Sequence, residues 1–435
     1  MRDLPPANGT CWDVIVCGAG VAGLSAARAL ELLGLRVLLL EKQRVPVAIA
    51  KGEVLQPSSL EVLREWGVLP LLRRRGAVPL HGLAVREPDG RALMHFDYQA
   101  VPGRDRGLLS LDYPAILDAF RESLGPGVDT RAGVLVDAPV MDGDRVVGVH
   151  CRAQGRPELF HAPLVIAADG RSSRLRRATA VTAEPSGYPH RLLSFELHAA
   201  GPEGQEVTSY LSPQGLRLLY PLPDGRLRLY AQVRPEELRG AGRAELERWC
   251  ADAVAGTPAL APLAAPLRAA LGTRQLLTLW RFTATALTAP GLALIGEAAH
   301  CVHPMAAQGM NTAIADSATL ARSLAACRRV TGAADGVPLA ASQVDRALAL
   351  YAAERRDWVR HMDRMSHDAT RLVTQVSWPA RALGRRVLRR IDANPRLRHR
   401  ATVNMAGLVM EPFTVLDRLH QLGLPDPRSR RVPTS

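Results

Sequence analysis

The residues whose types and spacing could do chemistry are concentrated between Ile295 and Ile314, in the stretch IGEAAHCVHPMAAQGMNTAI. An acid, two histidines, a proline and a Gly-Met-Asn turn lie here between an apolar segment and a segment of helix formers. His300 and His303 could transfer protons, but a histidine beside such a turn more often fixes the loop by hydrogen bonding to the backbone. A loop that only joins two elements needs none of these residue types, so we expect this one to work together with other parts of the chain.

A glycine motif near the N-terminus predicts a dinucleotide ligand. In VIVCGAGVAGLSAARALELLGLRVLLLEK, an apolar run leads to Gly18, Gly20 and Gly23 at GxGxxG spacing, followed by helix formers, a second apolar run and Glu41. Such glycines permit a tight turn, admit a pyrophosphate and let the helix pack close to the strand, and the helix N-terminus attracts the phosphates. Glu41 lies 18 residues after Gly23, where an acid binds ribose hydroxyls. An acid at this position favours FAD or NAD over NADP.

A second motif, LVIAADGRSSRLR, is an apolar run that ends in Asp169 and Gly170 and continues with Ser173 and Arg176. This matches the pattern Asp-Gly-x-x-Ser-x-x-Arg. At this point the chain resembles the FAD-dependent group A flavoprotein monooxygenases, which include para-hydroxybenzoate hydroxylase and the quinone-biosynthesis hydroxylases. In that family the motif serves the FAD pyrophosphate and the reaction with NAD(P)H. The family's third motif, Gly-Asp-Ala-Ala-His…Pro…Gly-x-Asn, corresponds to the stretch between Ile295 and Ile314, and the three motifs occur in the family's order.

The resemblance implies which residues hold FAD. In the third motif the acid binds the ribityl chain, and the proline and the Gly-x-Asn backbone lie against the flavin ring. Together with the glycine motif, this implies a cofactor-binding set of Gly18, Gly20, Val21, Ala22, Gly23, Glu41, Lys42, Lys51, Asp169, Gly170, Gly296, Glu297, Pro304, Gly309, Met310 and Asn311. Three positions depart from the family pattern: Glu297 replaces an aspartate, Ala307 stands where glycine is common, and Lys51 stands where arginine is frequent.

The resemblance also implies an activity. We expect an FAD-dependent monooxygenase that uses NAD(P)H and O2 to hydroxylate a lipophilic aromatic substrate through a flavin C4a-hydroperoxide, in secondary metabolism or quinone-type biosynthesis. Epoxidation of an alkene or polyene uses the same intermediate and stays open as an alternative. A geranylgeranyl-reductase-like flavoenzyme and a non-catalytic, FAD-bound, membrane-associated protein stay open as well. No catalytic residue can be assigned from the sequence; the candidates are Lys51, Tyr210, Tyr220 and Arg217, with Arg281 as a further pocket residue.

The predicted fold class is α/β, with a Rossmann-like FAD-binding domain, an inserted mixed β-sheet substrate domain and a C-terminal helical region. Strand-like segments separated by Ser-Pro-Gln-Gly and Pro-Asp-Gly turns predict the inserted sheet. The expected boundaries are 10–75, 105–180 and 281–340 for the FAD-binding domain, 76–104 and 181–280 for the substrate domain, and 341–435 for the helical region.

Composition limits the class of protein and its partners. The 435 residues are 47% hydrophobic and 22% charged, which is typical of a globular protein. The net charge of +13 comes almost entirely from arginine, since Lys42 and Lys51 are the only lysines. A GC-rich coding sequence explains this bias, and anionic partners are the other interpretation. We expect no nucleic-acid partner, because no such motif occurs, and no metal site, because the six cysteines are scattered without a CxxC pair.

The terminal segments indicate where in the cell the protein is expected to reside. The N-terminus lacks the apolar segment of a signal peptide, and no apolar run reaches the roughly 18 to 20 residues that span a bilayer, so we expect a cytoplasmic protein. Towards the C-terminus, WPARALGRRVLRRID predicts a basic amphipathic helix with Leu383, Val387, Leu388 and Ile391 on one face. Packing against the FAD-binding domain is the favoured interpretation of this tail, and peripheral contact with an anionic membrane is the alternative.

Overall fold

The apolar runs around the glycine motif form neighbouring strands of a mostly parallel sheet in the computed structural model. The structure describes residues 12–45, 52–199, 205–330 and 338–431. β1 (Val14–Cys17) pairs with β2 (Val37–Glu41) on one side and with β12 (Leu164–Ala167) on the other. Because these strands are adjacent and parallel, the first two motifs leave the sheet at the same edge. The six-stranded order is β18-β19-β12-β1-β2-β8, with β8 at Val128–Ala132, β18 at Thr288–Ala289 and β19 at Leu292–Leu294.

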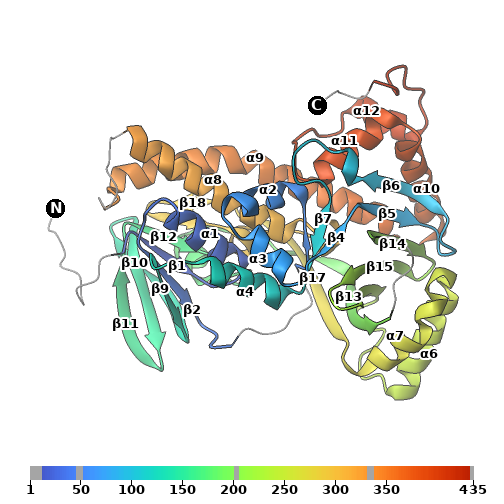
Figure 1. The fold of residues 1–435 in the computed structure, drawn as a ribbon, viewed down its shortest axis with the longest axis horizontal. Helices are drawn as coiled ribbons and strands as arrows, with labels where there is room; N and C mark the ends of the chain where they lie inside the picture. The colour runs from blue at the N-terminus through green and yellow to red at the C-terminus, as the bar shows by residue number, and fades with distance from the viewer. Residues whose placement is uncertain (1–11, 46–51, 200–204, 331–337, 432–435) are drawn as a thin grey trace.

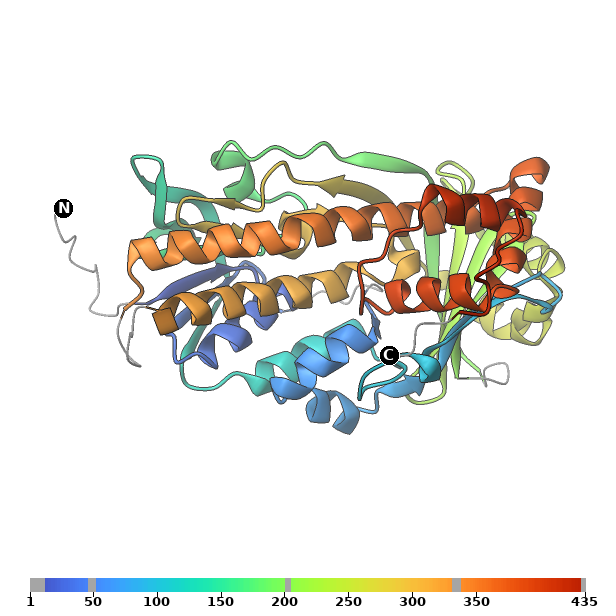
Figure 2. The same ribbon diagram turned by 90° about the horizontal axis from the view of Figure 1, so that it is seen from above.

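Helices and a smaller sheet cover this parallel sheet. α1 (Val21–Glu31) packs against α8 (Gly309–Val330), and α8 packs against α9 (Ala341–Val373). Figure 2 shows the two long helices side by side, with α9 extending into the other half of the molecule. The smaller sheet, of order β11-β10-β9, contributes to the same apolar core. The other elements of this half are α2 Pro57–Glu65, α3 Leu69–Arg74, α4 Tyr113–Ser123, α5 Arg174–Ala178, β9 Val134–Asp142, β10 Arg145–Ala153 and β11 Arg156–His161.

A second sheet of eight strands forms the other half (Figure 1). Its order is β20-β17-β13-β16-β15-β14-β5-β6, and its hairpins lie at the turns that the sequence predicts. The short strand β20 comes from the loop of the third motif, so this loop is hydrogen-bonded to the second sheet. The bounds are β5 Gly82–Arg86, β6 Ala92–Asp97, β13 Ser186–His198, β14 Glu206–Ser212, β15 Gly215–Leu222, β16 Arg226–Val233, β17 Gln275–Thr283 and β20 His300–Cys301.

Helices cover both faces of the second sheet. One face carries α6 (Arg243–Ala255) and α7 (Ala264–Ala269), and the other faces the C-terminal helices (Figure 1). Between the two halves runs a small sheet of order β3-β7-β4. The C-terminal helices are α10 Trp378–Asp392, α11 Pro395–Met405 and α12 Val415–Leu422, and the small strands are β3 Val54–Leu55, β4 Val78–Leu80 and β7 Leu108–Ser110. This architecture confirms the predicted fold class, and the proposed domain boundaries stay a prediction.

The expectation that Leu383 lies on the buried face of α10 is wrong. Leu383 is 52% exposed, whereas Val387, Leu388 and Ile391 are buried. Gly384 completes the buried face instead, because a Cβ at this position would lie 2.7 Å from the carbonyl oxygen of Leu372. The helix therefore turns its i, i+3, i+4, i+7 face inwards from the glycine. Among the described residues, no helix is long and apolar enough to cross a membrane.

Candidate active site

The turn after β1 requires glycine at two positions. Gly18 has φ +107°, and a Cβ there would lie 2.4 Å from the carbonyl oxygen of Ala168. A Cβ on Gly23 would lie 1.8 Å from the carbonyl oxygen of Gly18, so only glycine lets α1 pack this close to the turn. Gly20, the N-cap residue of α1, has no side chain to cap the helix, which leaves the first N–H groups of α1 for a bound anion.

The start of α1 also contacts the third motif. Val21 is buried, and the carbonyl oxygen of Ala22 accepts a hydrogen bond of 3.2 Å from Ser317 Oγ on α8. Gly296 has φ +57°, and a Cβ there would lie 2.8 Å from the Cβ of Ala22. The first and third motifs, which are far apart in the sequence, are therefore in direct contact.

Glu41 lies at the end of β2, where an adenosine ribose is expected. Its carboxylate accepts hydrogen bonds from the backbone N–H of Ala19 at 2.7 Å and of Gln43 at 2.8 Å. These two bonds fix the carboxylate at the edge of the sheet. Lys42 is exposed beside it.

The second motif links the sheet edge to the third motif. Asp169 Oδ2 accepts from the backbone N–H of Arg174 at 2.9 Å, while Oδ1 is buried and no described residue donates to it. Ser173 Oγ caps α5 by accepting from the N–H of Arg176. The Arg176 guanidinium donates to the carbonyl oxygen of Ala298 at 2.7 Å. Burial lowers the pKa of this arginine. Gly170, with φ +83°, allows the turn between the aspartate and the serine.

A buried carboxylate organises the third motif. Asp316 on α8 is fully buried; its Oδ2 accepts from the N–H of Gly296 at 3.0 Å and from His300 Nε2 at 2.7 Å, and its Oδ1 accepts from Arg355 Nε at 2.8 Å. Burial by itself raises the pKa of Asp316, but the charges of His300 and Arg355 and these hydrogen bonds lower it to about 2. The carboxylate therefore stays ionised and ties the loop to α8 and α9.

Two neutral histidines, His303 in this loop and His190 on β13, form a contact between the loop and the second sheet. His303 Nδ1 accepts from the N–H of Met305 at 3.1 Å, so in the neutral ring the proton lies on Nε2. His303 Nε2 lies 3.1 Å from His190 Nε2 on β13, and Tyr188 packs edge-on against the His303 ring. Burial, followed by the neighbouring histidines, lowers the pKa of His303, and burial lowers the pKa of His190 to about 4. His303 thus fixes the loop through the backbone, as the sequence predicts.

The Gly-Met-Asn turn begins α8 and holds the neighbouring loop. Asn311 is buried; its Nδ2 donates to the carbonyl oxygens of Val54 and Ala307, and its Oδ1 accepts from the N–H of Gln56. Ala307 has φ +49°, the left-handed conformation for which glycine is favoured, and this explains why glycine is common there. The short 3-10 turns before it are η4 (Gly296–Ala298), where Glu297 is exposed, and η5 (Pro304–Ala306).

The loop before β3 approaches the same place. Lys51 lies outside the described residues. The next residue, Gly52, has φ +63°, and a Cβ on it would lie 3.4 Å from the ring of Tyr113 and 3.7 Å from Met310 Sδ. A Cβ on Gly20 would also lie 3.4 Å from the Tyr113 hydroxyl. Tyr113 therefore lies between Gly20 at the start of α1 and Gly52, and Gly52 in turn lies near Met310 at the start of α8.

Sequence analysis missed a buried acid in this loop. Glu53 is 3% exposed, accepts from Tyr220 Oη at 2.8 Å and forms a two-point ion pair with Arg228, at 2.9 Å and 2.8 Å. Tyr220 and Arg228 lie on β15 and β16 of the second sheet. Burial, then the negative charge of Glu53, raises the pKa of Tyr220. Nothing in the local sequence marks Glu53, because its partners lie more than 160 residues away.

The side chains of two predicted pocket residues point away from the site. Tyr210 and Arg217 are register partners on β14 and β15, and Tyr210 packs in the core beneath α6. Arg217 is buried and donates to the carbonyl oxygens of Leu216 and Gln232. Because side chains alternate along a strand, these two residues face away from Tyr220, and they do not reach the site. Arg281 forms a two-point ion pair with Asp363 of α9 instead of lining a pocket.

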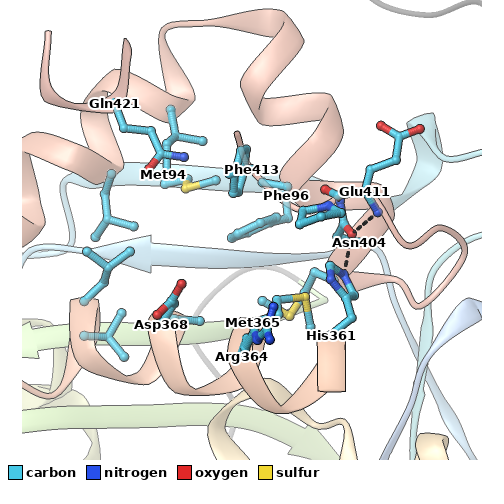
Figure 3. Close-up of a pocket in the computed structure, with 18 of the residues that line it drawn as sticks. Met94, Phe96, His361, Arg364, Met365, Asp368, Asn404, Glu411, Phe413 and Gln421 are labelled. Carbon is cyan, nitrogen blue, oxygen red and sulfur yellow. Dashed lines mark hydrogen bonds between the residues drawn. The ribbon is translucent and has the colours of Figure 1, made fainter. Parts of the chain in front are cut away.

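An apolar cavity of about 520 Å³ lies between β5, β6 and β14 of the second sheet and helices α9 to α12 (Figure 3). Met305 of η5 reaches it, so the cavity adjoins the loop that the resemblance places against the flavin ring. A second, more polar cavity of about 580 Å³ includes Glu53 and Arg228. The apolar cavity is lined by Leu83, Val85, Met94, Phe96, Leu388 and Phe413, among others.

The arrangement fits FAD. The uncapped start of α1 and the glycines around it suit a pyrophosphate, the fixed carboxylate of Glu41 suits a ribose, and the buried Asp169 Oδ1 faces the same edge without a protein partner among the described residues. Gly20 and Gly52 carry no side chain into the space beside Tyr113, where a Cβ on either would lie 3.4 Å from this tyrosine. The assignment of individual residues to FAD stays a prediction.

Known proteins resemble this chain in sequence and structure. The FAD binding domain family matches residues 11–361. The 6-methylpretetramide 4-monooxygenase of Streptomyces rimosus is 31% identical over 325 residues, which cover 72% of this chain and 75% of that protein. The 3-demethoxyubiquinol 3-hydroxylase of Escherichia coli is 27% identical and covers 70% of this chain and 77% of that protein.

Solved structures of other proteins also resemble this chain. P. aeruginosa PqsL in complex with 2-aminobenzoylacetate has a TM-score of 0.70 and 26% identity, and covers 82% of this chain and 95% of that chain. The p-nitrophenol 4-monooxygenase PnpA of Pseudomonas putida DLL-E4 has a TM-score of 0.76 at 20% identity, over 93% and 99% of the two chains, and shows the shared fold.

The fold and the three motifs define a flavin-binding oxidoreductase with a second, eight-stranded sheet. The chain belongs to the FAD binding domain family. Within it, the chain is a group A FAD-dependent monooxygenase.

The close approach of α1 to the turn makes a first prediction. In Gly23→Ala, the added methyl group meets the carbonyl oxygen of Gly18, so α1 must move away from the pyrophosphate position. We expect loss of most bound FAD, measured by the ratio of flavin to protein absorbance after purification. Gly272→Ala is the matched control, because a Cβ there meets nothing within 4 Å and its φ suits alanine. Equal FAD content in the two variants would contradict the prediction.

The histidine pair makes a prediction about pH. The pKa of His303 is lower in the folded chain than in the unfolded chain, so the unfolded chain binds the proton more strongly and stability falls as pH drops below about 6.5. His303→Asn removes the titrating ring but keeps an acceptor for the Met305 N–H. Between pH 7.5 and 5, the wild type should lose about 1 to 2 kcal/mol more unfolding free energy than this variant.

Urea denaturation at the two pH values measures this difference. His198→Asn is the control, because His198 is exposed and far from the pair in the sheet. It should behave as the wild type does. An equal pH dependence for the wild type and His303→Asn would show that His303 is not held neutral by the fold.

Proposed function

We propose that this monooxygenase hydroxylates a lipophilic aromatic substrate, with NAD(P)H as reductant, in secondary metabolism or quinone-type biosynthesis. The observation that carries the proposal is the apolar cavity that Met305 joins to the third motif. In the overall reaction one oxygen atom of O2 enters the substrate, the other leaves as water, and NAD(P)H supplies two electrons. Two relatives and one structural neighbour are named for their action on 6-methylpretetramide, demethoxyubiquinol and p-nitrophenol. These names support an aromatic substrate.

The residues of this chain have defined parts in that proposal. FAD, when bound, supplies the redox chemistry and the activation of oxygen. The cofactor-binding set predicted from the sequence would hold it, with Asp316, His300 and Arg355 fixing the loop beside the ring. The N-terminal N–H groups of α8 place a positive dipole end at Gly309 and Met310. The apolar walls of the cavity exclude water from the reacting centre.

The alternatives carry less support. Epoxidation is represented by squalene monooxygenase of Mus musculus, which is 26% identical over only 38% of this chain. A reductase that inserts no oxygen and a non-catalytic flavin protein are disfavoured, because the relatives that match over most of this chain include named monooxygenases and hydroxylases. Product analysis separates the three reactions: hydroxylation gives a hydroxylated arene, epoxidation gives an epoxide, and the reductase gives a reduced alkene.

The experiment is NAD(P)H oxidation by the FAD-loaded protein with a panel of phenols, quinolones, prenylated aromatics and polyenes under ¹⁸O2. We expect one aromatic class to stimulate oxidation and to gain one ¹⁸O atom. Val85→Phe fills the cavity wall and should reduce that stimulation about tenfold or more, whereas Leu276→Phe, on exposed β17, should not. Stimulation without ¹⁸O in any product would contradict oxygen insertion.

We further propose that the protein touches an anionic membrane at its periphery through α12; its cytoplasmic location stays a prediction. The polar residues Asp417, His420 and Gln421 of this helix are buried, while its apolar side is exposed. Arg386 and Arg390 of α10 lie beside Gly423 at the end of α12, so positive charge borders the apolar surface. The exposed apolar residues are Val415, Leu416, Leu419, Leu422 and Leu424.

Vesicle sedimentation tests this contact. The protein should bind phosphatidylglycerol-containing vesicles more than pure phosphatidylcholine vesicles, and the double variant Val415→Ser/Leu419→Ser should lose most of this binding. The double variant Leu159→Ser/Leu276→Ser, which removes two exposed apolar side chains from β11 and β17, should bind as the wild type does. No binding of the wild type to either vesicle would overturn the proposal, and concentration-dependent dimerisation through α12 would replace it.

A further inference from the structure

The inner face of α12 presents an unusual amide to the apolar cavity. Gln421 is 3% exposed and, like Met94, lines the cavity (Figure 3). Its Oε1 accepts from Arg418 Nη1 at 3.3 Å. Arginine only donates, so the atom that faces it must be the oxygen, and the NH2 group of Gln421 must face elsewhere. No described residue accepts a hydrogen bond from this buried Nε2.

The sheet wall of the same cavity contains a second buried polar atom of this kind. Ser209 lies on β14 between Val207 and Leu211, which face the same side of the sheet, and its register partner on β5 is Val85. Ser209 is 1% exposed and lines the cavity, yet no described residue pairs with its Oγ. A buried hydroxyl without a partner weakens a fold, so its presence in an apolar wall needs a reason.

Several other polar groups of the cavity are already paired. His361 Nε2 donates to Asn404 Oδ1 at 2.8 Å, and the Asn404 amide also binds the backbone of Glu411, as Figure 3 shows. Arg418 is paired with Asp368 at 2.5 Å. These groups hold the walls together. Asp357, Arg360 and Arg364 also line the cavity, but they are exposed. Gln421 and Ser209 are therefore the buried residues of the lining whose polar atoms have no partner among the described residues.

We propose that Gln421 and Ser209 determine specificity by binding a substrate oxygen, so that the cavity selects aromatic compounds that carry a carbonyl or another hydrogen-bond acceptor. This rests on the proposed function, because it assigns the apolar cavity to the substrate. The NH2 group of Gln421 can only donate, and the Ser209 hydroxyl can donate as well. An arene without an acceptor would leave both groups unpaired after water is displaced, and sites of this kind reject such ligands strongly.

Binding of a matched ligand pair tests the inference without turnover. We choose 9-fluorenone and fluorene, which share ring shape and differ in one carbonyl. Equilibrium dialysis with the FAD-loaded full-length protein, in the absence of NAD(P)H, should give fluorenone a Kd about tenfold lower than that of fluorene. Gln421→Met removes the donor at similar size and should abolish most of this preference. Ser209→Ala should reduce it.

Two further variants separate loss of the hydrogen-bond donor from a folding defect. Gln421→Glu keeps the size and the bond to Arg418 but replaces the donor with an acceptor, so it should also lose the preference for fluorenone. Gln205→Met, an exposed glutamine outside the cavity, should behave as the wild type does. FAD content and melting temperature show which variants are folded.

The outcomes separate this inference from the proposed function. A ketone preference that survives in folded Gln421→Met and Gln421→Glu overturns it, and so does equal binding, or no binding, of the two ligands by the wild type. Substrate-stimulated NAD(P)H oxidation with ¹⁸O incorporation stands or falls independently, because the dialysis experiment involves no oxygen chemistry.

Discussion

One buried carboxylate holds the site together. Asp316 accepts hydrogen bonds from the turn at Gly296, from His300 in the same loop and from Arg355 on α9. A buried charge is stable only when it is paired, and removal of one partner from such a cluster typically costs about 3 to 5 kcal/mol. The conformation of the loop that approaches the predicted flavin position is therefore fixed by these contacts. Its conformation is set by α8 and α9, the longest helices of the molecule.

The two halves of the protein are joined at the places where chemistry is expected. β20, from the third motif, pairs with β17 of the second sheet, and Glu53, from the loop before β3, is bound by Tyr220 and Arg228 of that sheet. Both loops thus bridge the half that contains the six-stranded sheet and the half that contains the eight-stranded sheet. Because hydrogen bonds and ion pairs are directional, geometry at the site depends on contacts that a small shift of either half would break.

Sequence alone could predict the fold class and the three motifs, because each depends on local spacing: glycines at close approaches, an acid at the end of β2, and a turn at the start of α8. It could not predict contacts between distant segments. Glu53 looks like an ordinary surface acid until the sheet supplies its partners. Tyr210 and Tyr220 are equally good candidates in the sequence, and only strand register separates them. Leu383 was misplaced by one position, since Gly384 appears unremarkable until Leu372 packs against it.

α12 has its polar side inside and its apolar side outside, and its two sides therefore have different neighbours. Substitutions on the outer side, such as those at Leu419 or Leu422, leave the groups that line the cavity unchanged, and substitutions of Gln421 leave the outer surface unchanged. Under the two proposals made above, membrane contact and ligand preference would therefore vary as separate traits. For the same reason, protein engineers could replace exposed apolar residues of α12 to make the recombinant enzyme more soluble without changing its ligand preference.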